Sequence, residues 1–473
     1  MLHLIIKKEI HDNFLNERFV SACVVILLLI VSSIVVLTEN YKGVVADYHN
    51  RVATQDTFID QFGHINRAGW MGKPLREPSH FQPVVLGIDR EAEQENFVSN
   101  PVPALFSRLD FVTIVTIILS LMAILFSYNS VSGEREEGLL KQMLSSSISR
   151  KVILLGKFIG GNISLLIPFT IGGLTGLLYI ALNPRVQLQS MDFGVFLILL
   201  LASHLYVAAF SGLGLLFSAR SHTSNEALLK SLFAWVIVVL VIPNISPFLA
   251  AQIYRIPSAA KIERETLAIT STERDEIVNQ RTREILQSKF ADIASVTGMS
   301  QKEIQEKTES DPRFRERFAE YSKAWYELVG EVNREQGAKA DKIISVFNQR
   351  SKYQEKLATI FASVSPFSNF LFIATDVTGT GIDGENHWQK QAALYLGMFT
   401  NYVEGQYQKE KQKNPALTVN DYLELRDRPR FQYQPQPFAE KLGPTLPQFG
   451  LLVFFNLIFF VGAFVSFLKY DAR

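Results

Sequence analysis

The sequence predicts an all-α membrane protein with six transmembrane helices. Six segments of about 20 residues, the length that crosses a bilayer, contain no Asp, Glu, Lys or Arg. The mean hydropathy is +0.12 although 20% of the residues are charged, which indicates membrane spans mixed with solvated segments. The six predicted spans are residues 19–37, 111–128, 158–182, 193–217, 231–251 and 449–468.

An interfacial helix is predicted over residues 1–18, before the first span. The apolar residues Leu2, Ile6 and Ile10 recur at helical spacing beside Lys7, a pattern typical of a helix that lies in the membrane surface. The first span is interpreted as a retained anchor. Its apolar run is too long for a signal peptide, and no clean cleavage site follows it.

Short loops carry the topological information, because their Lys and Arg residues stay in the cytoplasm. Positive residues gather before the first span, within residues 129–157, between the fourth and fifth spans, and after the last span. The short loop 183–192 on the opposite side has only Arg185. We therefore expect both termini in the cytoplasm, and residues 38–110 and 252–448 outside it.

The larger outer segment, residues 252–448, is predicted to be a mainly helical domain. Three stretches alternate charges of both signs with Ile, Leu, Phe and Trp at helical spacing. A further helix is expected from His387, and a proline-rich stretch then favours an extended lead into the last span. The domain is expected to handle substrate or to contact an extracytoplasmic partner.

A charged stretch, "SGEREEGLLKQML", separates the second and third spans. Ser132-Gly133 breaks the preceding helix, and Glu134, Glu136 and Glu137 suit the first turn of a new one, where the helix dipole favours negative charge. The leucines and the methionine that follow fall on one face. The result is a short amphipathic helix, and spacing alone fits docking on another protein as well as it fits an ordinary interfacial helix.

The longer stretch "SGEREEGLLKQMLSSSISRKVILLGKFIGG" resembles the cytoplasmic loop of ABC transporter permeases of the type-2 exporter family. Two residues depart from the family pattern: Leu139 stands where Thr is common, and Ser147 where Pro is usual. The long outer segment, with "SPFSNFLFIATDVTGTG" inside it, resembles a branch with a large extracytoplasmic loop. The resemblance implies a coupling helix that docks on the ATPase, formed by Glu134, Arg135, Glu136, Gly138, Leu139, Leu140, Met143 and Leu144.

The resemblance also implies the partners. Two separate ABC ATPase subunits would bind below two permease subunits, identical or paralogous, in the cytoplasmic (inner) membrane. ATP and Mg would sit on the ATPase, with no cofactor in this chain, and the family favours export. The sequence has no G-x-x-x-x-G-K-[ST] motif, so this chain is not expected to hydrolyse ATP or to be an enzyme.

Other chemistry finds little support in the sequence. The net charge of +1 gives no field for nucleic acid. The single cysteine, Cys23, cannot form an intrachain disulfide. The eight histidines are scattered and no H-E-x-x-H motif occurs, so no metal site is expected. No nucleophile elbow is present either, and no catalytic residue is predicted.

Polar residues inside the spans are candidates for a transport path. His204, Asn162 and Asn244 are the ones selected, because a polar group in lipid usually faces protein or water. The simpler interpretation of His204 is a hydrogen bond to a neighbouring helix. Pro243 and Pro247 interrupt the fifth span, where they fit a kink, a re-entrant turn or the plain end of a helix.

Three functions stay open at this point. The first is the permease subunit of an ATP-driven transporter. The second is a mechanical or signalling anchor, in which ATP hydrolysis below moves the outer domain against an envelope partner without moving cargo. The third is a structural membrane protein without an ATPase. The first two share the coupling helix and differ in whether a path leads through the spans.

Overall fold

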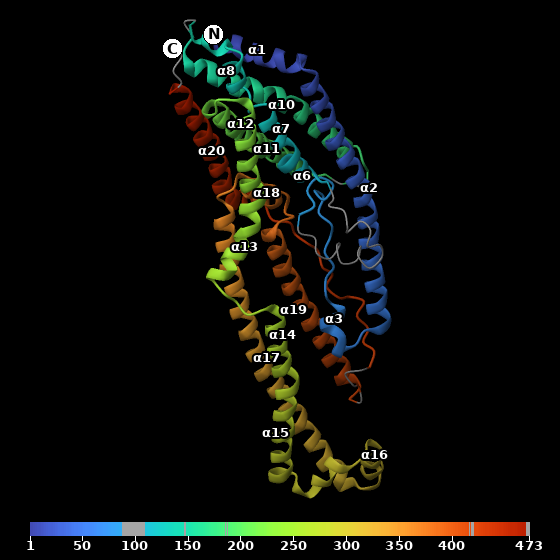
Figure 1. The fold of residues 1–473 in the computed structure, drawn as a ribbon. Coiled ribbons are helices and arrows are strands. Elements are labelled where there is room, and N and C mark those ends of the chain that lie inside the picture. The colour runs from blue at the N-terminus through green and yellow to red at the C-terminus, as the bar shows by residue number, and fades with distance from the viewer. Residues whose placement is uncertain are drawn as a thin grey trace. The chain divides into compact units, whose positions relative to one another are not determined.

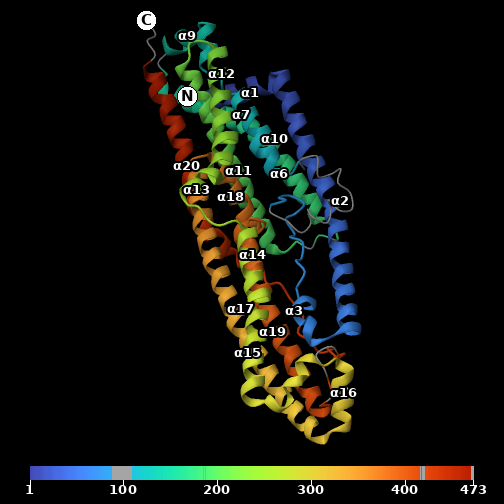
Figure 2. The ribbon, with the colours of Figure 1, turned by 60° about the horizontal axis from the view of Figure 1, so that its bottom comes forward.

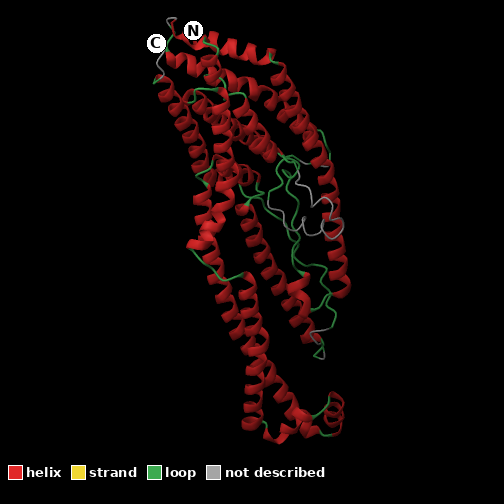
Figure 3. Ribbon diagram, viewed as in Figure 1, coloured by secondary structure: helices red, strands yellow, loops and turns green. Residues whose placement is uncertain are grey.

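The computed structural model describes residues 1–87, 109–145, 148–184, 186, 188–415, 417 and 421–469, without the side chains of Asn66 and Leu144. Arg185 and Ser147, named above, lie outside these residues. All regular structure in the described part is helical, as predicted (Figure 3). The chain divides into two compact units, Met1–Pro243 with Ala362–Arg473 (unit 1) and Asn244–Phe361 (unit 2).

Unit 1 contains most of the apolar helices, and helix α13 crosses its boundary with unit 2. Helix α13 (Ile242–Ile253) has only its first two residues in unit 1. In order, the other helices of unit 1 are α1 (Leu2–Leu15), α2 (Glu17–Phe62), η1 (Ile65–Arg67), α3 (Ala68–Met71), α6 (Phe111–Thr113), η2 (Ile114–Leu119), α7 (Ser120–Leu125), α8 (Ser132–Glu136), α9 (Leu139–Ser145), α10 (Arg150–Ala181), α11 (Ser190–Arg220), α12 (Ser224–Trp235), η3 (Val236–Val241), α18 (Pro366–Thr378), α19 (Ile382–Lys413) and α20 (Phe438–Leu468).

Five helices of the described part are long and apolar enough to cross a membrane: α2, α10, α11, α20 and the continuous run Ser224–Ile253. The predicted span 111–128 appears as a shorter apolar run, Phe111–Leu125. This run lies inside unit 1, where Ile114, Leu119 and Ile124 are fully buried. Tyr206 of α11 donates a hydrogen bond to the carbonyl of Thr116, 2.9 Å away. Protein therefore covers much of the short run.

Helix α2 continues far beyond the predicted span 19–37. Its 46 residues extend about 70 Å at 1.5 Å per residue, against a hydrocarbon core of about 30 Å. Residues 38–62, expected as part of a loop, are therefore helical. Asn16 separates α1 from α2 and accepts a hydrogen bond from the backbone N–H of Arg18.

Two glycine pairs on α10 give close approach to its neighbours. A Cβ on Gly156 would lie 2.5 Å from Ile5 Cγ2, and one on Gly160 would lie 2.7 Å from Glu9 Cβ, both on α1. About three turns further along α10, a Cβ on Gly176 would lie 2.1 Å from Ile34 Cδ1 of α2, while one on Gly172 would be in ordinary contact with Ile30 at 3.4 Å. Both pairs have G-x-x-x-G spacing, which lets helices pack at short range in membranes.

The fifth predicted span is one helical run with a π-helical segment, η3, in its middle. In a π-helix the residue five positions on donates to each carbonyl, and Pro243 has no N–H to give to Val238. The hydroxyl of Ser365 fills the place, donating to the Val238 carbonyl at 2.5 Å. The prolines therefore neither end the helix nor form a re-entrant turn, since α13 continues through Pro247 to Ile253.

Helix α18 belongs to the core of unit 1. The sequence assigned it to the outer domain 252–448, but Ile373, Ala374 and Val377 are buried with the spans. Phe370 stacks on Tyr206 of α11 with ring centroids 5.0 Å apart. At 13 residues, α18 is too short to be recognised as a span by length, although its apolar face packs like one.

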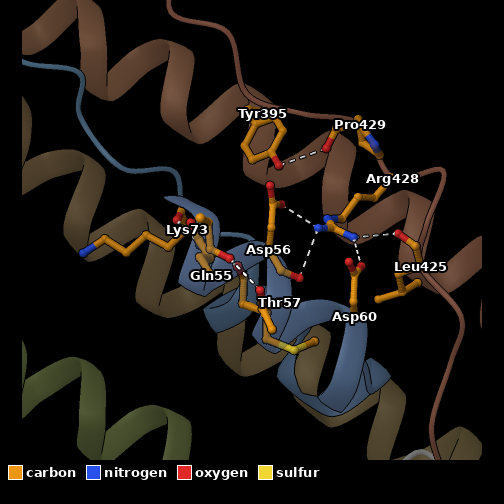
Figure 4. Close-up of polar contacts among 11 residues, drawn as sticks. Gln55, Asp56, Thr57, Asp60, Lys73, Tyr395, Leu425, Arg428 and Pro429 are labelled. Atoms are coloured by element: carbon orange, nitrogen blue, oxygen red, sulfur yellow. Dashed lines mark hydrogen bonds and ion pairs between the residues drawn. The ribbon is translucent and has the colours of Figure 1, made fainter. Parts of the chain in front are cut away.

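A second cluster in unit 1 joins the far part of α2 to α3, α19 and the segment 421–437 (Figure 4). The buried guanidinium of Arg428 donates to Asp56 Oδ1 at 2.5 Å and also pairs with Asp60. Burial lowers the pKa of Arg428, but the two carboxylates more than offset this and hold it above its usual value. Gln55 donates to the carbonyls of Met71 and Lys73, both at 2.8 Å.

Unit 2 is a long helical hairpin (Figures 1 and 2). The side chain of Arg281 pairs with Glu335 at 3.0 Å, and Arg317 pairs with Asp292 at 2.9 Å, so the two arms run antiparallel. The second predicted helical stretch divides into α16 and the first part of α17, and the third continues α17. The helices are α14 (Ala259–Ala268), η4 (Ile269–Glu273), α15 (Arg274–Lys289), η5 (Ala291–Gly298), α16 (Gln301–Ser310) and α17 (Pro312–Ala362).

Candidate functional site

The charged stretch lies at the end of unit 1 where α1 and the last turn of α20 also lie (Figures 1 and 2). The single amphipathic helix predicted from Glu134 to Leu144 is not formed. Instead α8 ends at Glu136 and α9 begins at Leu139. Gly138 between them has φ +73°, a left-handed conformation that glycine adopts without strain and that ends a helix.

Arg135 of α8 holds the C-terminal end of α11. Its guanidinium donates to the carbonyl of Ser221 at 2.5 Å and to that of Ala219 at 3.2 Å. The last carbonyls of a helix have no partner inside it and carry partial negative charge, which favours a cation there. In the opposite direction, Ser218 Oγ of α11 accepts the backbone N–H groups of Val131 and Ser132, at 2.9 and 3.1 Å.

Glu136 holds the N-terminal end of α12. Its carboxylate accepts the backbone N–H of Ser224 at 3.2 Å and the Ser224 hydroxyl at 2.6 Å. Free N–H groups and the positive dipole end favour an anion at this position. Neighbouring charges on α8 thus bind the two helix ends that flank the short α11–α12 connection.

Glu134 binds a third long helix, α10. Its Oε1 accepts Lys157 Nζ at 2.6 Å, and the same ammonium donates to Glu9 of α1 at 2.9 Å. The Lys157 side chain is only 3% exposed. One buried cation therefore ties α1, α8 and α10 together. On α1, Asn13 adds a hydrogen bond to Ser164 of α10, at 3.2 Å.

The apolar residues of α9 divide between two faces. Leu140 is fully buried in a cluster with Val131, Ile153 and Leu154, and Met143 packs on this cluster. Leu139, by contrast, is 44% exposed. The side chain of Leu144 is outside the described part. Much of the predicted apolar face is therefore covered by the chain itself, and the exposed edge includes Glu137, Gly138, Leu139, Lys141 and Gln142.

The three candidates for a transport path lie in different surroundings. His204 of α11 contacts Thr170 Oγ1 of α10 at 2.9 Å and the Leu200 carbonyl at 2.6 Å, a contact between neighbouring helices. Asn162 of α10 lines a cavity. Asn244 is exposed on α13. No hydrogen bond among the described residues joins His204 to Asn162.

Four residues of this site were not selected from the sequence: Lys157 as an ion-pair centre, Glu9, Ser218 and Ser224. For Lys157 a signal was present, because a lysine stands inside the G-x-x-x-G spacing of Gly156 and Gly160, next to a charge-free span. Ser218 and Ser224 gave no signal, since a serine near a helix end is common and its partner is distant in sequence.

The described part of the molecule is thus a multi-span helical membrane protein, with a pair of short helices, α8 and α9, fastened to the ends of its long ones. Its sequence matches the family model described as "ABC-2 family transporter protein" over residues 3–472. The chain belongs to this family. The match confirms the resemblance to ABC transporter permeases and the expectation of a transporter protein rather than an enzyme.

Two curated relatives carry the name "Probable ABC transporter permease protein NosY". The one from Pseudomonas aeruginosa is 32% identical over 150 residues, covering 32% of this chain and 53% of the relative. The one from Stutzerimonas stutzeri is 30% identical over 140 residues, covering 30% and 50%. The chain thus spans about half the length of the curated relatives that it matches.

Proposed function

We propose that this chain is the membrane-spanning permease subunit of an ABC transporter, in which α8 and α9 couple ATP hydrolysis by a separate ATPase subunit to transport. One observation carries the proposal. Three consecutive charged residues, Glu134, Arg135 and Glu136, bind α10, α11 and α12 respectively. A displacement of α8 would therefore be transmitted to all three of these helices. The adjoining edge of α9 is exposed, so a partner can contact it.

The wider assembly follows from the family. Two permease subunits, identical or paralogous, would pair in the cytoplasmic membrane, and ATP and Mg would be held by the ATPase. We place α8, α9 and both termini on the cytoplasmic side, with Phe111–Leu125 as the sixth span, and we take export as the direction. We also propose that unit 2 contacts an extracytoplasmic protein.

Helix α1 has the properties of an interfacial elbow helix. Met1, Leu4 and Leu15 expose apolar side chains, and Lys7 and Lys8 are exposed beside them. Such a helix lies with its apolar face among acyl chains and its cations near anionic headgroups. Because α1 also shares Lys157 with α8, it would follow the movement of the coupling segment.

The test replaces the exposed leucine of α9. The tagged chain is purified with the ATPase that associates with it, identified by its nucleotide-binding motif and its ATP hydrolysis. Leu139→Asp would place a carboxylate in the apolar contact, so we expect at least a tenfold loss of bound ATPase, equivalent to about 1.4 kcal/mol. Leu267→Asp, at an exposed leucine of α14, serves as the matched control and should retain the ATPase.

Two results would contradict the proposal: no ATPase with the wild-type chain, or unchanged yield and turnover with Leu139→Asp. Transport is measured separately, with the complex in proteoliposomes. ATP hydrolysis that depends on Leu139 but moves no cargo would favour the mechanical or signalling anchor instead.

A further inference from the structure

A polar cavity lies between α1, α7, α10 and α11 of unit 1. It offers about 30 Å³ to the centres of water-sized molecules and about 410 Å³ when its mouth is included. The first figure leaves room for one or two small groups. Polar side chains line part of the wall, among them Glu9, Asn162 and Ser211, and Phe126 and Phe158 line another part.

The nitrogen atoms of the wall are already engaged. Asn162 Nδ2 donates to the Phe158 carbonyl at 2.8 Å, and Asn13 Nδ2 donates to Ser164 at 3.2 Å. Lys157 donates to Glu9 and to Glu134. The ammonium and both amides therefore each place at least one N–H group in a bond within the protein. The lining side chains also carry oxygen atoms: the Glu9 carboxylate, the Asn162 amide and the Ser211 hydroxyl.

One of these oxygens has no partner among the described residues. Asn162 is 7% exposed, and its Oδ1 is buried without a hydrogen bond. An unsatisfied buried acceptor costs about 1–3 kcal/mol, a cost that a donor brought within hydrogen-bond distance of this oxygen would remove. Replacing Asn162 with leucine would also remove this cost, because it removes the buried acceptor.

The charge balance points to a positive donor. Glu9 and Glu134 carry two negative charges around the single positive charge of Lys157, so the cluster has a formal charge of −1. Buried charges are stable when they are paired. A cation beside Glu9 would complete the pairing, and the rings of Phe126 and Phe158 suit a cation that carries hydrocarbon.

We propose that this cavity binds a primary ammonium group on a short apolar chain. The ammonium would donate to Asn162 Oδ1, the Glu9 carboxylate and the Ser211 hydroxyl, while the hydrocarbon faces the two phenylalanines. A free aliphatic amine and the ethanolamine headgroup of a lipid share this chemistry. The site does not depend on the coupling role of α8 and α9, so either proposal can fail without the other.

The test uses the full chain in phosphatidylcholine nanodiscs and ethylammonium chloride as the probe. We expect a saturable rise in Tm that neither potassium chloride nor tetraethylammonium chloride produces at equal ionic strength. Asn162→Leu should weaken the apparent affinity about tenfold or more, because it removes the free acceptor. Asn244→Leu makes the same chemical change outside the cavity and should leave the affinity unaltered.

A second set of measurements distinguishes a free amine from a lipid headgroup as the source of the ammonium group. If the lipid headgroup is the occupant, phosphatidylethanolamine nanodiscs raise Tm and blunt the response to ethylammonium. If the occupant is a free amine, they change neither. Absence of a saturable rise in both arms would overturn the proposal, as would an equal response from Asn162→Leu. Should that variant fail to fold, Ser211→Ala provides the same comparison.

Discussion

Lys157 shows how much one residue can determine at this site. Its ammonium is the shared partner of two carboxylates from helices that are distant in sequence, Glu9 and Glu134. A buried ion pair adds little net stability, but removing one partner leaves a buried charge without compensation. The cation here serves two carboxylates, so its loss would leave both uncompensated.

Replacing Lys157 with Met should therefore destabilise the protein strongly. We expect a loss of about 3–5 kcal/mol in the free energy of unfolding, measured by denaturant titration of the purified chain in detergent. Lys151→Met is the matched control, because Lys151 is an exposed lysine of the same helix. Surface changes of this kind stay within about 0.5 kcal/mol.

The triple variant Glu9→Gln, Glu134→Gln, Lys157→Met gives the internal check. It removes the charges together, so most of the lost stability should return. A single Lys157→Met variant that unfolds like the wild type would show that the carboxylates do not depend on this cation.

At the residue scale, the contacts of the charged stretch could not be predicted from the sequence. Glu134, Arg135 and Glu136 were selected for their charge and their position at a predicted helix start. Their partners lie 23 to 88 positions away along the chain, and spacing within one helix carries no information about such contacts. Leu140 was placed on a docking face, yet it is buried, because an apolar stripe looks the same whether it packs inward or binds a partner.

The contact between α1 and α10 belongs to the scale of the element. Glycine at 160 lets the two backbones approach, since a Cβ there would lie 2.7 Å from Glu9 Cβ and 3.2 Å from the Ile6 carbonyl. Gly161 is the adjacent glycine of the same helix and has no such neighbour within 4 Å. Substitutions at Gly160 and Gly161 therefore distinguish the effect of packing on stability from the effect of helix propensity.

Alanine at these two positions should change stability in opposite directions. Gly161→Ala should stabilise the protein by up to about 1 kcal/mol, the difference in helix propensity. Gly160→Ala should destabilise it and weaken the seating of α1, because backbone atoms must move apart. The measurement is Tm together with the rate of proteolysis within residues 1–16. Equal and positive shifts in Tm would show that α1 is not seated on Gly160.

Helix existence was predictable for most elements, and helix ends were not. Residues 38–62 were expected as a loop because the apolar run stops at Leu37, but only Gly43 interrupts their helical tendency. The same reasoning divided α17 near Gly337, which the helix tolerates. A change of solvent along a helix alters its polarity without ending it.

At the scale of the whole molecule, the two units have separate apolar clusters. Unit 2 has Val332 fully buried against Val278 and Leu328 between its two arms. The core of unit 1 consists of residues from other helices. Loss of one cluster should therefore leave the other intact.

Val332→Asp tests this independence. A buried carboxylate without a partner should open the hairpin, so hydrogen–deuterium exchange should rise throughout residues 274–335. Exchange in α10 and α11 should stay as in the wild type. Val346→Asp, at an exposed valine of the same helix, should change neither. Faster exchange in both units would mean that they unfold together.

The sequence predicted the membrane class and the family from about thirty residues, and the family model then matched residues 3–472. It did not distinguish α18 from the rest of residues 252–448. Helix α18 has an apolar composition but only 13 residues, so a rule based on the length of a span does not select it. Its place beside α11 depends on contacts such as Phe370 with Tyr206, which are far apart in sequence.

The left-handed backbone at Gly138 gives α8 and α9 separate axes. The hydrogen bonds that anchor α8 therefore place no demand on the residue types along the free edge of α9, and that edge can change its chemistry while the anchorage stays intact. A connection of this kind would let the same helix bundle bind a different ATPase after substitutions in α9 alone. The residue type is restricted only at position 138, because any residue with a side chain would adopt the left-handed conformation there at a cost of about 1–2 kcal/mol.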